Sequence, residues 1–391
     1  MFLRDKTIVI VSQLDWGDMF ISKHHYAVEL SKLGNIVYYM NGPDRKNELK
    51  RGEIKIEETA YPNLFVIKHN FFFPYIIVFK ARLLFNWFIS IHISRIIKKI
   101  EPARPLIIWS FDQSNTVPLK YFPKKSFKIY MPVDELNSKL AFDAAESAQA
   151  IFSVTNEIVN KLKYLGVPSL FVNHGVAANF LNTEIKASIN QPVVAALSGN
   201  FLRPDIDRPV LLSIVRQHSN VLFECWGSST LLSKNAKGKI NKTLGGYTDQ
   251  ETQAFIEEMI AQPNVIMHGS VPPAVLSNEL KKADVFLICY DINKDQSGGT
   301  NYHKVLEYLA CGKATVSNNI TTYQQYPGLL LMPQSRENNN ELPSIFSNAI
   351  NNLLELNSVA SQQRRIDFAK QYLYSSQVKK IEAFIEGHVK Q

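Results

Sequence analysis

Short apolar runs alternate with amphipathic segments along most of the chain. Runs such as Thr7–Ser12 contain an unbroken apolar stretch, which is typical of strands buried on both faces of a parallel sheet. Helical segments such as His24–Leu33 separate these runs. The pattern predicts an α/β fold assembled from βαβ units. The expected strands are Thr7–Ser12, Asn35–Met40, Pro105–Ser110, Lys128–Met131, Ala150–Val154, Ser169–Asn173, Pro192–Ser198, Asn220–Trp226, Asn264–His268, Asp284–Cys289, Ala314–Ser317 and Leu329–Met332.

The same pattern starts again in the second half of the chain, which predicts two successive domains. A chain of 391 residues is also too long for one hydrophobic core of ordinary size. We expect two Rossmann-like parallel-sheet domains facing a cleft, because ligands of such sheets bind beyond the carboxyl ends of the strands. The polar stretch Leu181–Gln191 is expected to link them, and Ser228–Gln250 to form a long surface loop. The expected domain limits are 1–180 and 191–370, followed by a C-terminal helical segment at 371–391.

The charge balance and the cysteines narrow the class of protein. Lys and Arg outnumber Asp and Glu by 43 to 35, and such an excess suits nucleic acid, anionic lipid or an anionic substrate. No segment has the pattern of a nucleic-acid-binding module, so nucleic acid is the least favoured of the three. The three cysteines have neither metal-ligand spacing nor the number for a disulfide framework, which favours a reducing cytoplasm. The N-terminus has the pattern of a first strand, not that of a signal peptide.

The segment Ser297–Ser317 is predicted to be a glycine loop, a short helix and a buried strand. Gly298 and Gly299 allow backbone N–H groups to turn toward a ligand at the helix N-terminus, which carries partial positive charge. Lys304 and Glu307 share one helix face, so the cation can meet a diphosphate while the carboxylate accepts from sugar hydroxyls. The spacing therefore suggests a nucleotide-diphosphate site. The alternative is an ordinary αβ unit in which these two side chains form an exposed ion pair.

The aromatic segment Phe71–Ile93 is long enough to cross a bilayer, but Lys80, Arg82 and Asn86 lie in its middle. A charged residue there costs roughly 2.5–3.5 kcal/mol, so we expect no membrane span. Two alternatives remain: a mostly buried helix, which we favour, or an interfacial helix on anionic headgroups. Phe71–Tyr75 is the expected membrane-facing edge. The cations available for the interfacial alternative are Lys80, Arg82, Arg95, Lys98 and Lys99.

The segment Lys304–Val316 resembles the donor-site helix of glycosyltransferases with the GT-B fold, especially family 4. Its sequence is Lys-Val-Leu-Glu-Tyr-Leu-Ala-Cys-Gly-Lys-Ala-Thr-Val. Val11–Leu30 is similar to the first strand, loop and helix of bacterial polysaccharide-building transferases, and Leu197–Phe201 to the glycine loop that opens their second domain. The resemblance implies an acceptor-binding first domain and a second domain that binds the nucleotide sugar, UDP-linked more than GDP-linked. It also implies that the C-terminal helix crosses back onto the first domain.

The resemblance implies a role for each matching position of the donor site. Gly199 and Asn200 would approach the diphosphate with Arg203 as counter-ion, although Arg203 is equally well read as a solvated loop residue. The other implied nucleotide-binding positions are Ser270 and Val271 beside the base, Gly299, Thr300, Asn301 and Lys304 at the capped helix start and phosphates, and Glu307 at the ribose. Family 4 enzymes usually carry two glutamates in an E-x7-E pattern. Glu307 matches the second, but Gly299 occupies the first position, so a retaining or inverting outcome is left open.

An inverting transfer needs a base that deprotonates the acceptor hydroxyl. Asp134 is the first candidate because it follows an expected strand, and Asp15 and Asp18 in the loop after the first strand are the next. The alternative for Asp134 is a helix N-terminal acid. His24 and His25 are adjacent and point in different directions, so we expect them to pack or to touch the acceptor. No Asp-x-Asp motif occurs, and catalysis without a bound metal or other cofactor is expected.

The sequence therefore predicts a glycosyltransferase that uses a nucleotide-diphosphate sugar to build a bacterial surface polysaccharide or glycolipid. Its expected place is the cytoplasmic face of the cell membrane, in peripheral contact with anionic lipid. Two alternatives stay open. One is a nucleotide-sugar 2-epimerase of the same fold, and the other is a non-catalytic nucleotide-sugar-binding subunit, which Gly299 favours.

Overall fold

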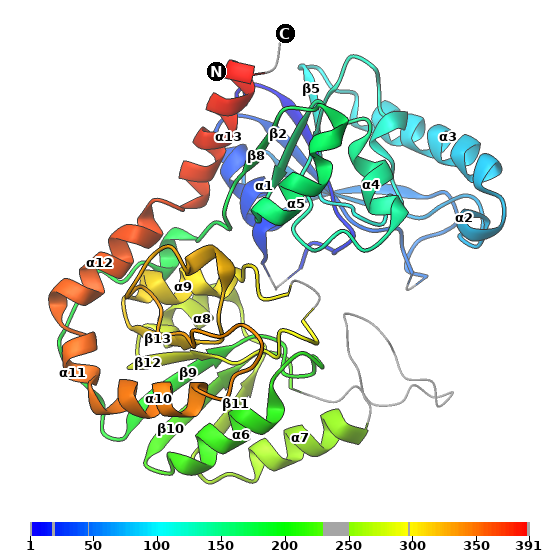
Figure 1. The fold of residues 1–391 in the computed structure, drawn as a ribbon. Coiled ribbons are helices and arrows are strands. Elements are labelled where there is room, and N and C mark those ends of the chain that lie inside the picture. The colour runs from blue at the N-terminus through cyan, green and yellow to red at the C-terminus, as the bar shows by residue number, and fades with distance from the viewer. Residues whose placement is uncertain (1, 18–19, 46, 230–249, 296–297, 389–391) are drawn as a thin grey trace. The chain divides into compact units, whose positions relative to one another are not determined.

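The computed structural model describes residues 2–17, 20–45, 47–229, 250–295 and 298–388 (Figure 1). Two compact units are present: Met1–Asn173 together with Tyr374–Gln391, and His174–Leu373. The predicted surface loop Ser228–Gln250 lies almost entirely outside the described residues, as do Asp18 and Ser297.

The first unit is built on an eight-stranded sheet with the order β3-β4-β2-β1-β5-β6-β7-β8. Neighbouring strands are parallel except for the edge pair β3 and β4, which is antiparallel. The strands are β1 (Thr7–Val11), β2 (Ile36–Met40), β3 (Ile54–Glu58), β4 (Leu64–His69), β5 (Leu106–Ser110), β6 (Phe127–Tyr130), β7 (Ala150–Ser153) and β8 (Ser169–Phe171). The helices are α1 (Ser22–Lys32), α2 (Ile77–Lys80), α3 (Arg82–Ile100), α4 (Lys139–Ala145), α5 (Asn156–Leu162) and α13 (Tyr374–His388).

Alternate side chains of the central strand β1 pack into two separate hydrophobic cores. Val9 and Val11 belong to the core that α3 covers, while Ile8 and Ile10 belong to the core that contains residues of α1 and α13. Every residue of β1 is buried. This burial on both faces is the reason that the strand reads as an uninterrupted apolar run.

The C-terminal helix α13 is part of the first unit, as the resemblance implied. It packs against α1, where the His25 and Tyr374 rings stack at 4.6 Å between centroids. The backbone N–H of Leu3 donates to Glu382 Oε1 at 2.8 Å, which attaches the start of the chain to the same helix.

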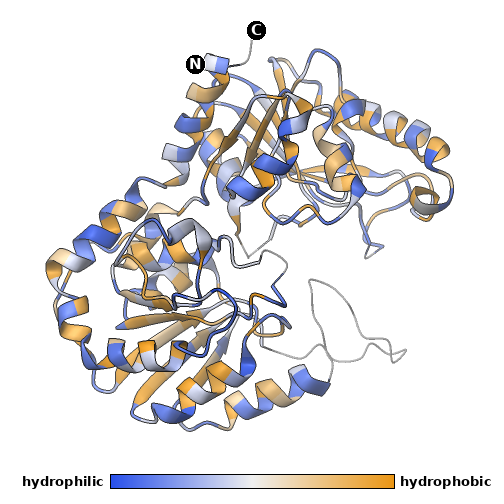
Figure 2. Cartoon of the chain, in the orientation of Figure 1, coloured by the Kyte–Doolittle hydropathy of each residue, from blue (hydrophilic) through white to orange (hydrophobic). Residues whose placement is uncertain are grey.

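The second unit contains a parallel five-stranded sheet with the order β11-β10-β9-β12-β13. Apolar residues line the strands, and the surrounding helices carry polar residues on their outer faces (Figure 2). The strands are β9 (Val193–Ser198), β10 (Val221–Trp226), β11 (Val265–Gly269), β12 (Val285–Ile288) and β13 (Ala314–Ser317). The helices are α6 (Arg208–Gln217), α7 (Gln250–Ile260), α8 (Pro273–Leu280), α9 (His303–Cys311), α10 (Leu342–Asn351), α11 (Leu353–Leu356) and α12 (Val359–Lys370). Two parallel-sheet units in one α/β chain confirm the expected fold class.

Two local expectations are corrected. Leu329–Met332 is not a strand, because only Leu331 pairs with β13, in a single bridge to Val316. The polar segment 181–191 lies within the second unit instead of linking the two units. It is fixed there because the Asp284 carboxylate accepts from the backbone N–H and the side-chain amide of Asn190.

The aromatic segment also differs from its prediction. Phe71 and Phe73 are only 3% and 5% exposed, so they do not form a membrane-facing edge. Their rings stack at 4.8 Å and pack under α3, because the buried face of this helix offers them apolar contact. The exposed apolar side chains are instead Ile76, Leu83, Leu84 and Trp87, which we call the α2–α3 patch. No helix in the described part of the chain combines the length and apolarity needed to span a membrane.

Candidate functional site

Three loops meet backbone to backbone at the carboxyl edge of the second sheet. Gly199 follows β9, Gly227 follows β10, and Gly269 ends β11. The N–H of Gly199 donates to the carbonyl of Trp226, and that of Gly227 donates to the carbonyl of Gly269, both at 2.8 Å. A Cβ on Gly227 would lie 1.7 Å from the Gly199 oxygen, so no other residue fits there without moving the backbone. The sequence pattern identified Gly199, whereas the role of Gly227 is visible only in the structure.

Helix α9 points an uncapped N-terminus toward the same edge. Its N-cap residue is Tyr302, and no side chain caps it, which corrects the expectation that Thr300 and Asn301 do so. The Thr300 carbonyl instead accepts from the backbone N–H and the hydroxyl of Thr322. An uncapped helix start keeps backbone N–H donors and partial positive charge available for an anion.

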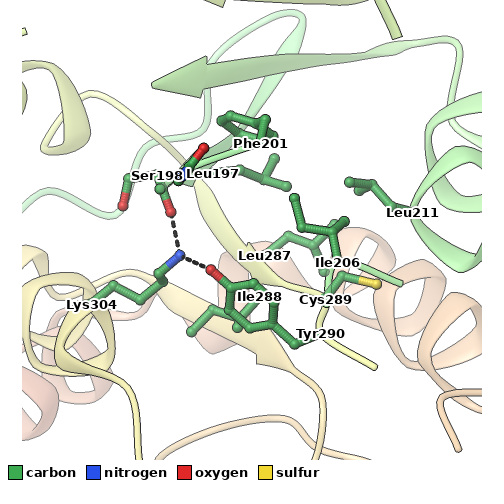
Figure 3. A pocket seen from close by; sticks show the side chains of 12 residues that line it. Leu197, Ser198, Phe201, Ile206, Leu211, Leu287, Ile288, Cys289, Tyr290 and Lys304 are labelled. Carbon is green, nitrogen blue, oxygen red and sulfur yellow. Dashed lines mark hydrogen bonds between the residues drawn. The ribbon is translucent and has the colours of Figure 1, made fainter. Parts of the chain in front are cut away.

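Lys304, in the first turn of α9, is buried, and its charge is not neutralised. The residue is 6% exposed, and its ammonium donates to the Ser198 carbonyl at 2.5 Å and to the Tyr290 hydroxyl at 2.6 Å (Figure 3). Both acceptors are uncharged, and Lys304 forms no salt bridge with any residue that the structure describes. Because an unpaired buried charge is costly, this arrangement favours a bound anion as the missing partner. The alternative of an exposed ion pair with Glu307 does not fit this burial.

Lys304 borders a pocket of about 310 Å³ that opens to solvent. The ends of β9 and β12 form its walls, with apolar side chains such as Phe201, Ile206 and Leu287 (Figure 3). This volume includes space that is continuous with the surrounding solvent. A mostly apolar wall with one cation suits a ligand that carries both a flat organic part and an anionic group.

Glu307 lies one turn after Lys304 on α9. Burial raises the pKa of Glu307 to about 7, against the opposing attraction of the Lys304 ammonium. A carboxylate that titrates near neutrality is costly to bury, and such groups concentrate at functional sites.

The loop before α9 is organised by Asp295, which the sequence analysis did not identify. Its carboxylate accepts from the N–H of Gly299 at 3.0 Å and from the Tyr302 hydroxyl at 2.7 Å. Gly299 has φ of +68°, and a Cβ there would lie 3.0 Å from Ile292 Cγ2. At the position where family 4 enzymes carry a glutamate, the backbone conformation and the close packing of this chain therefore favour glycine.

The remaining residues that were expected to bind the nucleotide are less buried than Lys304. Arg203 is held by the Asp205 carboxylate, which accepts from its Nε at 2.9 Å and also from Nη2, so its guanidinium is already paired. Asn200 accepts from the N–H of Leu202 and shapes the loop after β9. Ser270 is exposed and bonds to Ser228 through their hydroxyls at 3.1 Å. Val271 follows it and packs against the core of the second unit.

In the first unit, Asp134 and Asp15 are both exposed and both follow carboxyl ends of strands, β6 and β1. Beside Asp134 lies a side chain that the sequence analysis missed. Lys23 is 9% exposed, and burial lowers the pKa of its ammonium against the attraction of Asp134 and Asp112. A lysine in the first turn of a helix is ordinarily exposed to solvent, so nothing in the sequence indicated that Lys23 is buried.

His24 packs instead of lining a site. It is fully buried, accepts the N–H of Ile21 at Nδ1, and lies 3.0 Å from the Tyr39 hydroxyl at Nε2. Burial lowers the pKa of His24 to about 4, so the ring is neutral at physiological pH. Within the described ranges, no group of three or more His, Cys, Asp or Glu side chains has an arrangement that could hold a metal ion.

Solved structures share this two-unit architecture over nearly the whole chain. A HepE protein from Anabaena in complex with UDP and glucose aligns over 98% of this chain and 100% of its own, with a TM-score of 0.64 and 12% identity. Sucrose-phosphate synthase from Thermosynechococcus elongatus aligns over 98% of each chain, with a TM-score of 0.67 and 12% identity. The α,α-trehalose 6-phosphate synthase from Burkholderia multivorans aligns over 98% of each chain, with a TM-score of 0.66 and 10% identity.

These similarities show that the chain has the GT-B fold. No protein-family model matches the sequence, and no curated protein matches it.

Proposed function

We propose that this chain is a GT-B glycosyltransferase, related to family 4, that takes a sugar from a nucleotide-diphosphate donor. UDP is the favoured nucleotide, and GDP is the alternative. The acceptor is a lipid-linked or polysaccharide chain in bacterial surface glycan synthesis. The observation that carries the proposal is the buried, unneutralised ammonium of Lys304 beside an uncapped helix start. Two of the structural neighbours support the donor class: HepE in complex with UDP-glucose, and an E. coli protein bound with UDP-2-fluoro glucose.

In this proposal the diphosphate lies against Lys304 and the N-terminus of α9, close to the Gly199 backbone. Glu307 accepts hydrogen bonds from the ribose, and the base lies beside Ser270 and Val271. Leaving-group departure builds negative charge on the diphosphate, and donors held in place before the reaction stabilise that charge. Thr300 and Asn301, in the loop before α9, add polar groups near the phosphates.

The acceptor hydroxyl requires a base if the transfer inverts the anomeric centre. Asp134 is our first candidate and Asp15 the second, because both are solvent-accessible carboxylates at strand ends of the first unit. We propose that the reaction proceeds without a metal ion, with Lys304 and the α9 N-terminus supplying the positive charge.

Calorimetric titration with UDP and with GDP tests the donor site. We expect one nucleotide to bind the wild type and Lys304→Met to weaken that binding by at least about 10-fold, since a charge-assisted contact is lost. Lys313→Met is the matched control, because Lys313 is also 6% exposed but follows the other end of α9. If neither nucleotide binds the wild type, or if both variants lose affinity equally, the donor site is not at Lys304.

A non-catalytic nucleotide-sugar-binding subunit is the second candidate, and Gly299 in place of the family glutamate favours it. Such a subunit would bind UDP-sugar without releasing UDP in the presence of acceptor lipid extracts, whereas a transferase would release it. A 2-epimerase would instead convert the donor sugar without any acceptor.

We further propose that the protein is cytoplasmic and attaches peripherally to the inner face of the cell membrane through the α2–α3 patch. Leu83 and Trp87 are 86% and 60% exposed on the same end of α3. The exposed cation Lys80 ends α2 just before these side chains, and Lys98 and Lys99 are exposed at the opposite end of α3. Apolar side chains next to cations suit an anionic bilayer surface, where each cation contributes about 1 kcal/mol.

Co-sedimentation with phosphatidylglycerol vesicles tests the attachment. We expect the wild type to bind these vesicles and not phosphatidylcholine vesicles, and Leu83→Ser/Trp87→Ser to lose binding. Leu354→Ser is the control, because Leu354 is 66% exposed in the second unit. Equal binding by both variants would show that the patch is not the contact surface.

A further inference from the structure

The phenol of Tyr290 lies where a ligand at Lys304 would lie, and no role for it follows from the sequence motif. Tyr290 comes two residues after β12 and is 8% exposed, and it lines the same pocket as Lys304 (Figure 3). A Cβ placed on Gly199 would be 3.4 Å from its hydroxyl oxygen and 2.6 Å from the Lys304 ammonium. The hydroxyl, the ammonium and the glycine backbone therefore border one small volume.

The direction of the hydrogen bond between the two side chains decides what Tyr290 can offer. A lysine ammonium has donors and no acceptor, so in the 2.6 Å contact Lys304 donates and the phenol oxygen accepts. The proton of the Tyr290 hydroxyl is then left to donate elsewhere. Among the described residues, this hydroxyl donates to no protein group.

The ring is held in place independently of the hydroxyl. The backbone N–H of Tyr290 donates to Asn318 Oδ1 at 3.1 Å, and its carbonyl accepts from the Asn339 amide at 2.9 Å. The Tyr302 ring lies 4.9 Å away between centroids, and the Lys304 ammonium lies 4.8 Å from the Tyr290 ring centroid. Removal of the hydroxyl alone is thus expected to leave the ring where it is.

We propose that the Tyr290 hydroxyl donates a hydrogen bond to a non-bridging oxygen of the donor diphosphate, forming with Lys304 a pair of adjacent donors. This inference rests on the proposed function, because it assigns a further binding residue to the same donor site. Lys304 polarises the phenol by donating to its oxygen, which makes the phenol a stronger donor toward an anion. The pair compensates for Arg203, whose guanidinium is occupied by Asp205.

Tyr290→Phe separates this role from packing, because it keeps the ring and removes only the hydroxyl. Binding of UDP is measured by calorimetry, and binding of uridine, which has no phosphate, by ligand-observed NMR. We expect UDP affinity to fall about 10-fold or more and uridine affinity to stay unchanged. Tyr326→Phe, at a half-buried tyrosine that packs on Phe368 away from the pocket, should change neither.

The outcomes distinguish this inference from the function on which it rests. If the wild type binds UDP and Tyr290→Phe binds it equally well, the diphosphate contact is refuted while the donor site stands. An equal loss of UDP and uridine affinity would assign Tyr290 a packing role and also refute the contact. If the wild type binds neither UDP nor GDP, both the donor site and the role of Tyr290 are refuted.

Discussion

Replacing Glu307 by Gln should stabilise the second unit, and the gain should grow as the pH rises from about 5 to about 8. Burial raises the pKa of this carboxyl from its ordinary value of 4.5 to about 7. In this pH range the folded state therefore holds a proton that the unfolded state has released. The free energy of unfolding of the wild type falls as the pH rises through that window, and this loss is complete only above about pH 8.

The size of the effect follows from the two pKa values. Each pKa unit corresponds to about 1.4 kcal/mol, so the interval from 4.5 to about 7 sets an upper limit near 3.5 kcal/mol. Part of the Glu307 side chain reaches solvent, which screens the charge. We therefore expect Glu307→Gln to gain about 1 to 3 kcal/mol relative to the wild type between about pH 5 and pH 8.

Cysteine labelling provides the assay, because all three cysteines are free, buried and in the second unit. Urea titrations with a saturating thiol-labelling pulse then report the unfolding of this unit alone. The measured quantity is the difference in unfolding free energy between Glu307→Gln and the wild type at each pH, in which other titrating groups cancel. A difference that stays constant from about pH 5 to pH 8 would refute the raised pKa.

Three further outcomes are expected. Gly227→Ala should destabilise the second unit by several kcal/mol and abolish nucleotide binding, because its Cβ would lie 1.7 Å from the Gly199 oxygen. The control is Gly387→Ala in α13, where a Cβ meets no atom within 4 Å. This variant should be neutral or more stable by up to about 1 kcal/mol. Gly299→Glu should lower the urea midpoint of unfolding and should not raise activity. A side chain at φ of +68° is strained, and its Cβ would lie 3.0 Å from Ile292 Cγ2. An unchanged urea midpoint in the labelling assay would contradict this prediction. UDP at 100 times its dissociation constant should stabilise the second unit by about 2.7 kcal/mol in the same assay, and an unchanged midpoint would count against a site there.

Much of the fold was predictable because its signals are local. Apart from β3 and β4, the strands of both sheets were placed to within one or two residues from apolar runs such as those of β1 and β9. The hairpin of β3 and β4 was missed, since Ile54–Glu58 is a half-exposed edge strand with several charged residues. Leu329–Met332 was overpredicted, because an apolar run alone does not show whether a neighbouring strand is available to pair with it.

The candidate site was predictable only in outline. The glycine loop and the helix with Lys304 and Glu307 are consecutive in sequence, so their spacing indicated a phosphate site. Tyr290 follows an expected strand at the edge where ligands bind, and that rule could have identified it. Asp295 and Lys23 carried no signal, because an acid in a loop and a lysine at a helix start are ordinary solvated residues in most sequences.

Hydrophobic periodicity and glycine positions act over a few residues, so most strands and helices could be placed along the chain before the structure was known. The electrostatic state of the site, in contrast, arises from tertiary packing. The ammonium of Lys304 donates to a carbonyl 106 positions away in the chain, and Arg203 Nη2 lies 3.8 Å from the carboxylate of the distant residue Asp295. Whether a charge is buried, paired or left for a ligand depends on which distant segments pack around it, and this packing is set by the whole core and not by any local pattern.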